Sequence, residues 1–187
     1  MAGLRKDLLD NAADLLAGPG WGAVTMAELG SRVGVSRQTV YNEVGSKPEL
    51  AQALVLRELE RLLAAVVAEL EGSDDIVDGL EAAALAALRL GRDNVLLKAI
   101  VASAHGGDVG LLPLVTISAE PLLQRATTVV RAVVLQQHGG LGLSPARLGV
   151  AIDTVVRLVL SHVMQPAGTP EGTAVDIAWV ARRVLER

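Results

Sequence analysis

The sequence predicts an all-α fold, with a three-helix N-terminal helix-turn-helix module followed by a six-helix C-terminal part. Apolar residues make up 51% and charged residues 20% of the 187 residues, which is typical of a folded chain. Leu, Val and Ala carry the apolar content and Phe is absent; Leu and Ala favour helices, whereas residues that favour strands are few. Apolar residues recur at helical spacing between capping residues, Gly and Pro.

Composition argues against a disulfide-stabilised, thiolate-metal or membrane protein, and the charges are unevenly distributed. Without Cys, a disulfide scaffold and a thiolate metal site are excluded, and the chain suits a reducing cytoplasm. The sequence has no signal-peptide core and no run of about 18 apolar residues, so no contact with a membrane is expected. The net charge is −4, yet residues 1–48 hold five basic and five acidic residues. The excess of negative charge therefore lies in the C-terminal part.

The first three helices are bounded by short-range signals. Apolar residues at helical spacing predict a helix over 4–16, which Gly18 and the residues after it end. Thr25 to Glu28 form a capping box, in which the Thr side chain caps the Glu28 amide and Glu28 reaches back. The second helix ends at Gly34. Ser36 then caps a third helix over 37–44.

The remaining helices are predicted in the same way. Ser46 and Glu49 form a second capping box, with Pro48 in the first turn, and open a long helix over 47–71. Five further helices are expected over 76–90, 93–103, 120–138, 144–165 (capped by Ser144) and 169–185.

The second and third helices have the spacing of a helix-turn-helix. Val40 and Val44 would be buried, so the opposite face of the third helix presents Arg37, Gln38, Thr39, Tyr41 and Asn42. Arg can bind guanine with two hydrogen bonds, and Gln or Asn can do so with adenine. The hydroxyls of Thr25 and Tyr41 suit phosphates, as does Lys47 at a helix start.

Four runs of residues carry a resemblance to a known family: 20–29 (GWGAVTMAEL), 34–36 (GVS), 39–42 (TVYN) and 46–50 (SKPEL). They closely resemble the N-terminal domain of the Tet repressor (TetR) family, over about residues 5–55. The resemblance implies a homodimer with a DNA-binding domain at 1–47 and a ligand-binding and dimerisation domain at 48–187. The positions that match DNA-contacting ones are Thr25, Arg37, Gln38, Thr39, Tyr41, Asn42 and Lys47. Family members often have His and Phe where this chain has Glu43 and Val44.

The resemblance also implies the partners. The homodimer would form through the eighth and ninth expected helices, 144–165 and 169–185, and its two-fold symmetry would match a palindromic double-stranded DNA operator. Mostly apolar walls in the C-terminal part favour a small apolar or lipid-like ligand. The candidate polar ligand contacts, for each of which an ordinary core or paired role is the more common one, are Asn94, His105, Gln124, Thr128, Arg131 and His162.

These patterns predict a sequence-specific transcriptional regulator, a repressor that a ligand releases from its operator. The alternative is a helical ligand-binding protein whose helix-turn-helix no longer binds DNA, as Glu43 and the neutral N-terminal part would allow. We expect no enzyme: Ser103, His105 and Asp108 lie close in sequence without the surroundings of a nucleophile. The three histidines lie on separate segments, so no metal site and no cofactor are expected.

Overall fold

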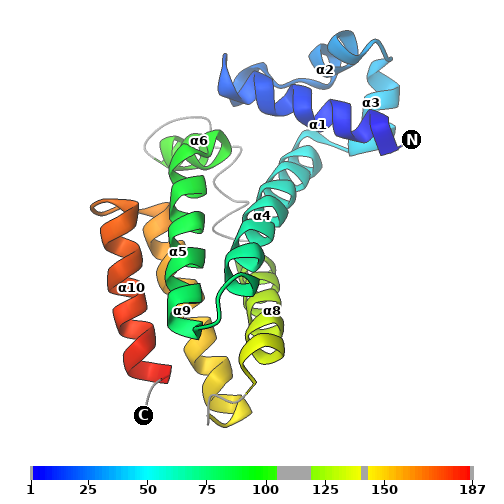
Figure 1. The fold of residues 1–187 in the computed structure, drawn as a ribbon. Helices are drawn as coiled ribbons and strands as arrows, with labels where there is room; N and C mark the ends of the chain where they lie inside the picture. Colours follow the sequence, from blue (N-terminus) through cyan, green and yellow to red (C-terminus); the bar gives the residue numbers. More distant parts are fainter. Residues whose placement is uncertain (1, 105–118, 140–142, 186–187) are drawn as a thin grey trace. The chain divides into compact units, whose positions relative to one another are not determined.

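The computed structural model describes residues 2–104, 119–139 and 143–185, and in these ranges the regular secondary structure is entirely helical (Figure 1). The helices are α1 (Ala2–Ala17), the 3-10 turn η1 (Trp21–Ala23), α2 (Met26–Val33), α3 (Arg37–Val44), α4 (Lys47–Glu71), α5 (Ile76–Asp93), α6 (Val95–Ala104), α8 (Ala119–His138), α9 (Pro145–Met164) and α10 (Pro170–Leu185). The predicted all-α fold is confirmed. None of these helices is long and apolar enough to cross a membrane.

Several helices begin at the capping residue that the sequence predicts. The hydroxyls of Thr25 and Ser36 each accept a hydrogen bond from the amide three residues further on, both at 3.1 Å. The Ser144 hydroxyl does the same at the start of α9, at 3.3 Å. Each bond satisfies an amide that has no partner within its own helix. Local sequence therefore fixes where α2, α3 and α9 start.

The two predicted capping boxes differ. At the start of α4, the Glu49 carboxylate accepts from the Ser46 amide at 2.7 Å, and the Ser46 hydroxyl accepts from the Glu49 amide at 3.5 Å. At the start of α2 only half of the box forms, because the Glu28 carboxylate binds Arg32 at 2.9 Å instead of reaching back. The prediction for Glu28 is wrong, since an ion pair four residues on competes for the carboxylate.

Helix α5 continues past the residue where the sequence predicts its end. The predicted end was residue 90, yet the helix runs through Gly91 to Asp93. A Cβ atom at position 91 would lie 2.8 Å from a methyl carbon of Val163 on α9. This glycine therefore serves close packing between two helices and does not end one.

The chain forms two compact units. The first comprises Met1–Glu58 and Asn94–Ala119, which contain α1 to α3, the first half of α4, and α6. Helix α1 packs against α2, α3 and α6. The core of the helix-turn-helix has fully buried side chains, among them Leu8, Leu29, Val40 and Leu50.

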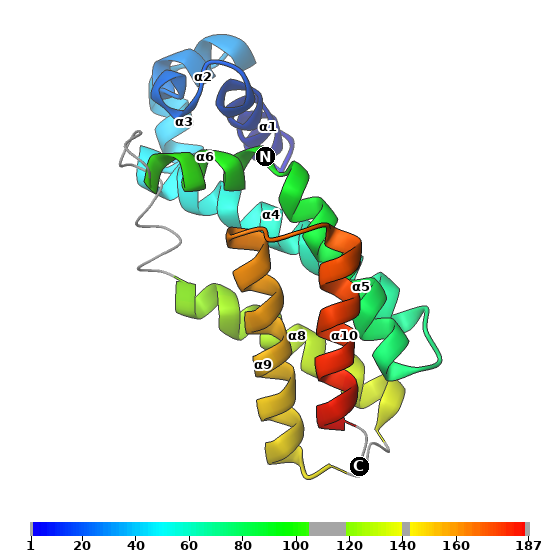
Figure 2. The same ribbon diagram turned by 90° about the vertical axis from the view of Figure 1, so that its left-hand side faces the viewer.

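The second unit comprises Leu59–Asp93 and Glu120–Arg187. Helix α5 packs against α9 and α10, and α9 and α10 run side by side (Figure 2). Its most deeply buried side chains include Leu70, Val77, Val134 and Ile177. Since α4 contributes to both units, these units differ from the predicted domains 1–47 and 48–187, and that domain boundary stays a prediction.

Candidate nucleic-acid interface

The turn between α2 and α3 is tight enough to require glycine at two positions. Gly34 ends α2 with a left-handed φ of 76°, which costs glycine little. A Cβ atom at position 30 would lie 2.7 Å from the carbonyl oxygen of Val35, so a larger residue there would push the turn open. These two glycines set how α3 follows α2.

Helix α3 has one buried face and one polar face, as predicted. Val40 and Val44 are 0% and 3% exposed. Arg37, Gln38, Tyr41 and Asn42 are exposed, and Thr39 is half-buried. The structure therefore brings the five predicted α3 residues to the outside of one short helix, where a partner can reach them.

Two pairs of side chains lie along this polar face. The Arg37 guanidinium donates to the Tyr41 hydroxyl at 3.1 Å and lies 5.4 Å from the centre of its ring. This hydrogen bond raises the pKa of Arg37. The Gln38 amide donates to the Asn42 side-chain oxygen at 3.0 Å. Both pairs join residues four apart, which are neighbours on a helix surface.

The two threonines of the predicted site have hydroxyls that contact groups three residues away in the chain. The exposed Thr25 hydroxyl accepts from the Glu28 amide, which leaves its own proton to donate outward. The Thr39 hydroxyl lies 2.9 Å from the Ser36 hydroxyl.

The Lys47 side chain has structural contacts in addition to its predicted role at the start of α4. Its ammonium group donates to the Trp21 carbonyl oxygen at 2.8 Å and lies 4.9 Å from the centre of the Trp21 ring. Trp21 itself is buried. An ammonium group has three N–H donors, so Lys47 can still reach a phosphate while it ties η1 to the start of α4.

The end of α3 holds a contact that the sequence analysis missed. Arg5 of α1 donates to the carbonyl oxygen of Glu43, in the last turn of α3, where carbonyl groups lack helical partners. Glu43 is half-buried. In the sequence, Arg5 has no acidic residue three or four positions away, which indicates that its partner lies elsewhere in the fold. The partner could not be identified from sequence, because Glu43 is 38 residues away.

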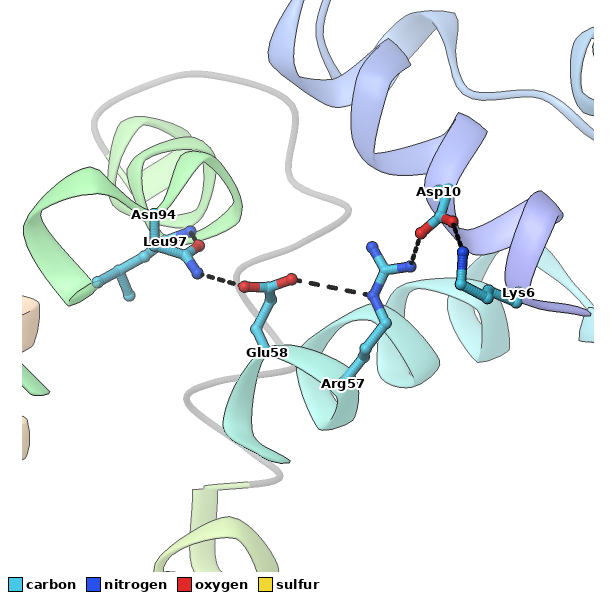
Figure 3. Close-up of polar contacts among 6 residues, drawn as sticks. All are labelled: Lys6, Asp10, Arg57, Glu58, Asn94 and Leu97. Carbon is cyan, nitrogen blue, oxygen red and sulfur yellow. Dashed lines mark hydrogen bonds and ion pairs between the residues drawn. The ribbon is translucent and has the colours of Figure 1, made fainter. Parts of the chain in front are cut away.

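A cluster of polar side chains connects three helices of the first unit (Figure 3). Arg57 of α4 binds Asp10 of α1 at 2.7 Å, and Lys6 binds the same carboxylate at 2.7 Å. The hydrogen bond from Lys6 and the charges of Lys6 and Arg57 lower the pKa of Asp10. The neighbouring Glu58 accepts from the Asn94 amide at 2.8 Å. The cluster ties α1 and the start of α6 to α4.

Asn94, predicted as a ligand contact, has structural partners on both sides of its amide. Its oxygen accepts from the Leu97 amide at 2.9 Å and so caps α6, while its nitrogen binds Glu58. Asn at such a position stabilises the first turn of a helix. Its assignment to a ligand stays a prediction.

The second unit contains a cavity of about 50 Å³ whose described wall is entirely apolar. It lies among α4, α5, α8 and α9, and no polar surface lines it. The α4 side chains in the wall are Leu59, Leu62, Leu63, Val66 and Leu70. Their spacing of three and four residues is the signal of a buried helix face, and the described wall is apolar, as the sequence favours.

The predicted polar ligand contacts lie elsewhere. Gln124 and Thr128 line a separate, partly polar hollow of about 270 Å³ with Asp153 and Arg157, and the last two pair with each other at 2.7 Å. Arg131 donates to the Pro145 carbonyl oxygen at 3.4 Å.

The other two predicted contacts are histidines. His162 is half-buried in the last turn of α9, and His105 lies outside the described residues. No described candidate lines the apolar cavity, and the ligand assignment of all six stays a prediction.

Helices α9 and α10 expose several large apolar side chains. Val150 is 68% exposed on α9, and Val175 and Trp179 are 54% and 60% exposed on α10. The Arg183 guanidinium lies 5.5 Å from the centre of the Trp179 ring.

Comparison with known proteins gives two family models that match separate parts of the chain. The model described as bacterial regulatory proteins, tetR family, matches residues 8–54. The model described as bacterial tetracyclin repressor, C-terminal domain, matches residues 75–183. The chain is also 31% identical over 186 residues to the HTH-type transcriptional regulator AlkX of Mycobacterium tuberculosis, an alignment that covers 98% of this chain and 86% of that protein.

Solved structures show the same fold over nearly the full length. The TetR family repressor AlkX from Dietzia sp., which is implicated in biodegradation of n-alkanes, superposes with a TM-score of 0.78 at 26% identity and covers 96% of both chains. A TetR-family transcriptional regulator from Mesorhizobium loti superposes with a TM-score of 0.71 at 18% identity, covering 98% of this chain and 96% of that one. The second likeness concerns the fold alone.

Proposed function

The chain belongs to the Tet repressor family and is a DNA-binding transcriptional regulator; from this membership we propose that it represses transcription at a palindromic operator and that a small apolar ligand releases it. The observation that carries the DNA-binding part is the polar face of α3, where Arg37, Gln38, Tyr41 and Asn42 are exposed together. A helix of this kind fits the major groove and can read base edges.

Phosphate contacts would come from outside the centre of α3. The Thr25 hydroxyl can donate its proton outward, because its oxygen already accepts from an amide. Lys47 has donors left beyond the one that it uses on Trp21. Such contacts position a protein on DNA without reading its sequence.

We infer dimerisation through α9 and α10, the eighth and ninth helices of the sequence prediction. Val150, Val175 and Trp179 are all more than half exposed on these two adjacent helices, and large exposed apolar side chains of this kind mark interaction sites. A second copy of the chain would cover them symmetrically. The two α3 helices would then read half-sites about 34–36 Å apart.

The ligand would enter the apolar cavity of the second unit. Its described wall offers no hydrogen-bond donor or acceptor, so burial of hydrocarbon is the interaction available there. The cavity of about 50 Å³ is smaller than the roughly 150 Å³ that hold a benzene molecule. Binding would therefore move helices apart, and a ligand that prefers the expanded state shifts the protein toward it. The n-alkane connection of the repressor from Dietzia sp. supports an apolar ligand.

Selection from random DNA tests the DNA-binding part. The purified full-length protein should enrich an inverted repeat, and binding measured by fluorescence anisotropy should weaken steeply with salt. Arg37→Ala should lose base preference while its melting temperature stays that of the wild type, because the side chain is exposed. Failure to bind any DNA above the non-specific level at low salt would contradict the proposal.

A matched pair of variants on α5 tests the ligand site. Ala87 lines the cavity and is buried, whereas the adjacent Ala86 is half-buried and does not line it. We expect Ala87→Val to fill the cavity and weaken release of DNA by n-decane, n-hexadecane or the corresponding fatty acids. Ala86→Val should respond like the wild type. If these compounds release DNA equally well from both variants, the ligand binds elsewhere.

Trp179 tests the dimer. A tryptophan at the centre of an interface commonly contributes about 2 kcal/mol, and Trp179→Ala removes it from both subunits of a symmetric dimer. The dimer dissociation constant should therefore rise roughly 1,000-fold in analytical ultracentrifugation. Leu56→Ala removes a comparably exposed side chain on α4 and should leave the dimer unchanged. An unaffected dimer in Trp179→Ala would argue for a different interface.

The alternative, a ligand-binding protein that has lost DNA binding, is not favoured. Its supports are the neutral N-terminal part and Glu43, which is half-buried and whose carbonyl group accepts a hydrogen bond from Arg5. The exposed base-reading positions 37, 38, 41 and 42 carry no acid.

A further inference from the structure

The four exposed residues of α3 are not independent contacts. Positions 37 and 38 each hold a side chain that donates to the residue four positions later, Tyr41 and Asn42. In both pairs the donor is the residue closer to the start of α3, the part of a recognition helix that contacts base edges. Tyr41 and Asn42 therefore restrain the side chains of Arg37 and Gln38, which lie nearer the bases.

Tyr41 contacts the Arg37 guanidinium through both its ring and its hydroxyl. The ring lies 5.4 Å below the guanidinium carbon, and the hydroxyl accepts one N–H at 3.1 Å. A guanidinium has five N–H donors, so four remain and a fork of two can face one base. Guanine presents two acceptors to such a fork in the major groove. The Tyr41 proton stays available to a phosphate.

Asn42 leaves Gln38 with the hydrogen-bonding groups that adenine requires. The Gln38 nitrogen uses one N–H on the Asn42 oxygen at 3.0 Å. One N–H and the Gln38 carbonyl oxygen remain. Adenine presents one acceptor and one donor side by side in the major groove, which matches this remaining pair.

We propose that Tyr41 and Asn42 are positioning residues that set operator selectivity, Tyr41 by holding Arg37 for a guanine and Asn42 by holding Gln38 for an adenine. We place the two bases in neighbouring base pairs of each half-site, since residues 37 and 38 both lie in the first turn of α3, the part of a recognition helix that contacts base edges. This inference rests on the proposed function, since it concerns how the same face reads DNA.

The test compares selectivity with overall affinity. The site that the wild type selects from random DNA should contain adjacent G·C and A·T pairs in each half-site. Affinity is then measured for this site, for two sites with one of these pairs replaced in both halves, and for unrelated DNA. Tyr41→Phe keeps the ring and loses the hydroxyl, so we expect the preference for G·C to fall about three- to tenfold while the A·T preference is unchanged. The lost phosphate donor lowers the affinity for all sequences by one common factor, which leaves these preferences unaffected.

Two variants at position 42 test whether the A·T preference depends on an oxygen that accepts from Gln38. Asn42→Ala should lower the preference for A·T by a similar factor and leave the G·C preference intact. Asn42→Asp keeps an oxygen that accepts from Gln38, so it should retain the A·T preference although its charge weakens binding to all DNA. All these residues are exposed, and circular dichroism confirms that the variants fold.

Distinct results overturn the inference and the proposed function. If Tyr41→Phe weakens binding to all sequences alike, Tyr41 serves only as a phosphate contact and the inference fails. It also fails if the selected half-sites lack adjacent G·C and A·T pairs, or if Asn42→Asp loses the A·T preference as Asn42→Ala does. Absence of any DNA binding by the wild type would instead refute the proposed function, and this inference with it.

Discussion

The polar face of α3 and the apolar cavity of the second unit are built by opposite means. On α3, hydrogen bonds between residues four apart on a single helix hold the functional side chains, and these side chains are exposed. The cavity wall has no polar surface in its described part and draws side chains from α4, α5, α8 and α9. A surface made within one helix tolerates substitution without loss of the fold, whereas a wall made by four helices does not.

A charge in the cavity wall should have the largest effect on stability. Val130 lines the cavity and is buried. Val130→Asp would bury an unpaired carboxylate, so the free energy of unfolding should fall by more than about 3 kcal/mol, measured by urea denaturation. Thr128→Asp, two residues away on the same helix but exposed, should change it by no more than about 0.5 kcal/mol. A tolerated Val130→Asp would mean that water reaches the cavity.

Lys47 combines a proposed phosphate contact with a structural contact to Trp21. Lys47→Ala removes the contact with the Trp21 ring and the bond to its carbonyl oxygen, and should lower the free energy of unfolding by about 1–2 kcal/mol. It should also weaken binding to all DNA alike and reduce the salt slope by about one. A loss confined to one base pair would contradict a phosphate role.

Asn94 distinguishes a helix cap from a ligand contact. Asn94→Ala removes the cap of α6 and the bond to Glu58, and should cost about 1 kcal/mol of stability while ligand release stays unchanged. Asn94→Asp keeps a good cap but puts a second carboxylate beside Glu58, so repulsion between the like charges should leave it less stable than the wild type. If Asn94→Ala abolished ligand release with its stability intact, Asn94 would be a ligand residue after all.

The smallest expected effect is the pH dependence of the capping box at α4. Hydrogen bonds from the backbone and side chain of Ser46 lower the pKa of Glu49. Its contribution to stability is therefore present above the pKa of the unfolded chain, about 4.3, and is lost as the pH falls through the lower folded value. Glu49→Gln should be less stable than the wild type at pH 7, with a difference that shrinks below about pH 4.5.

A control on the same helix separates this effect from general acid denaturation. Glu69 is an exposed glutamate of α4, and Glu69→Gln should follow the wild-type curve over the whole range. A pH-independent difference between Glu49→Gln and the wild type would show that the charge of Glu49 does not matter to the cap.

Most of the fold could be predicted from sequence because its signals are local. Thr25, Ser36, Ser46 and Ser144 cap the helices that they were predicted to cap, since a cap depends on residues three positions apart. The polar face of α3 follows from Val40 and Val44 in the same way. The prediction for Glu28 was wrong because Arg32 competes for its carboxylate, and the helix predicted to end at residue 90 continues to Asp93.

Sequence by itself thus determined the helices, the helix-turn-helix and the residues on its outer face. Tertiary packing was needed to show that Arg5 reaches the end of α3, that Lys47 contacts the Trp21 ring, and which side chains of four helices meet around the cavity. The reason is distance along the chain. Residues three or four apart on a helix are always neighbours, but residues tens of positions apart meet only where packed helices bring them together.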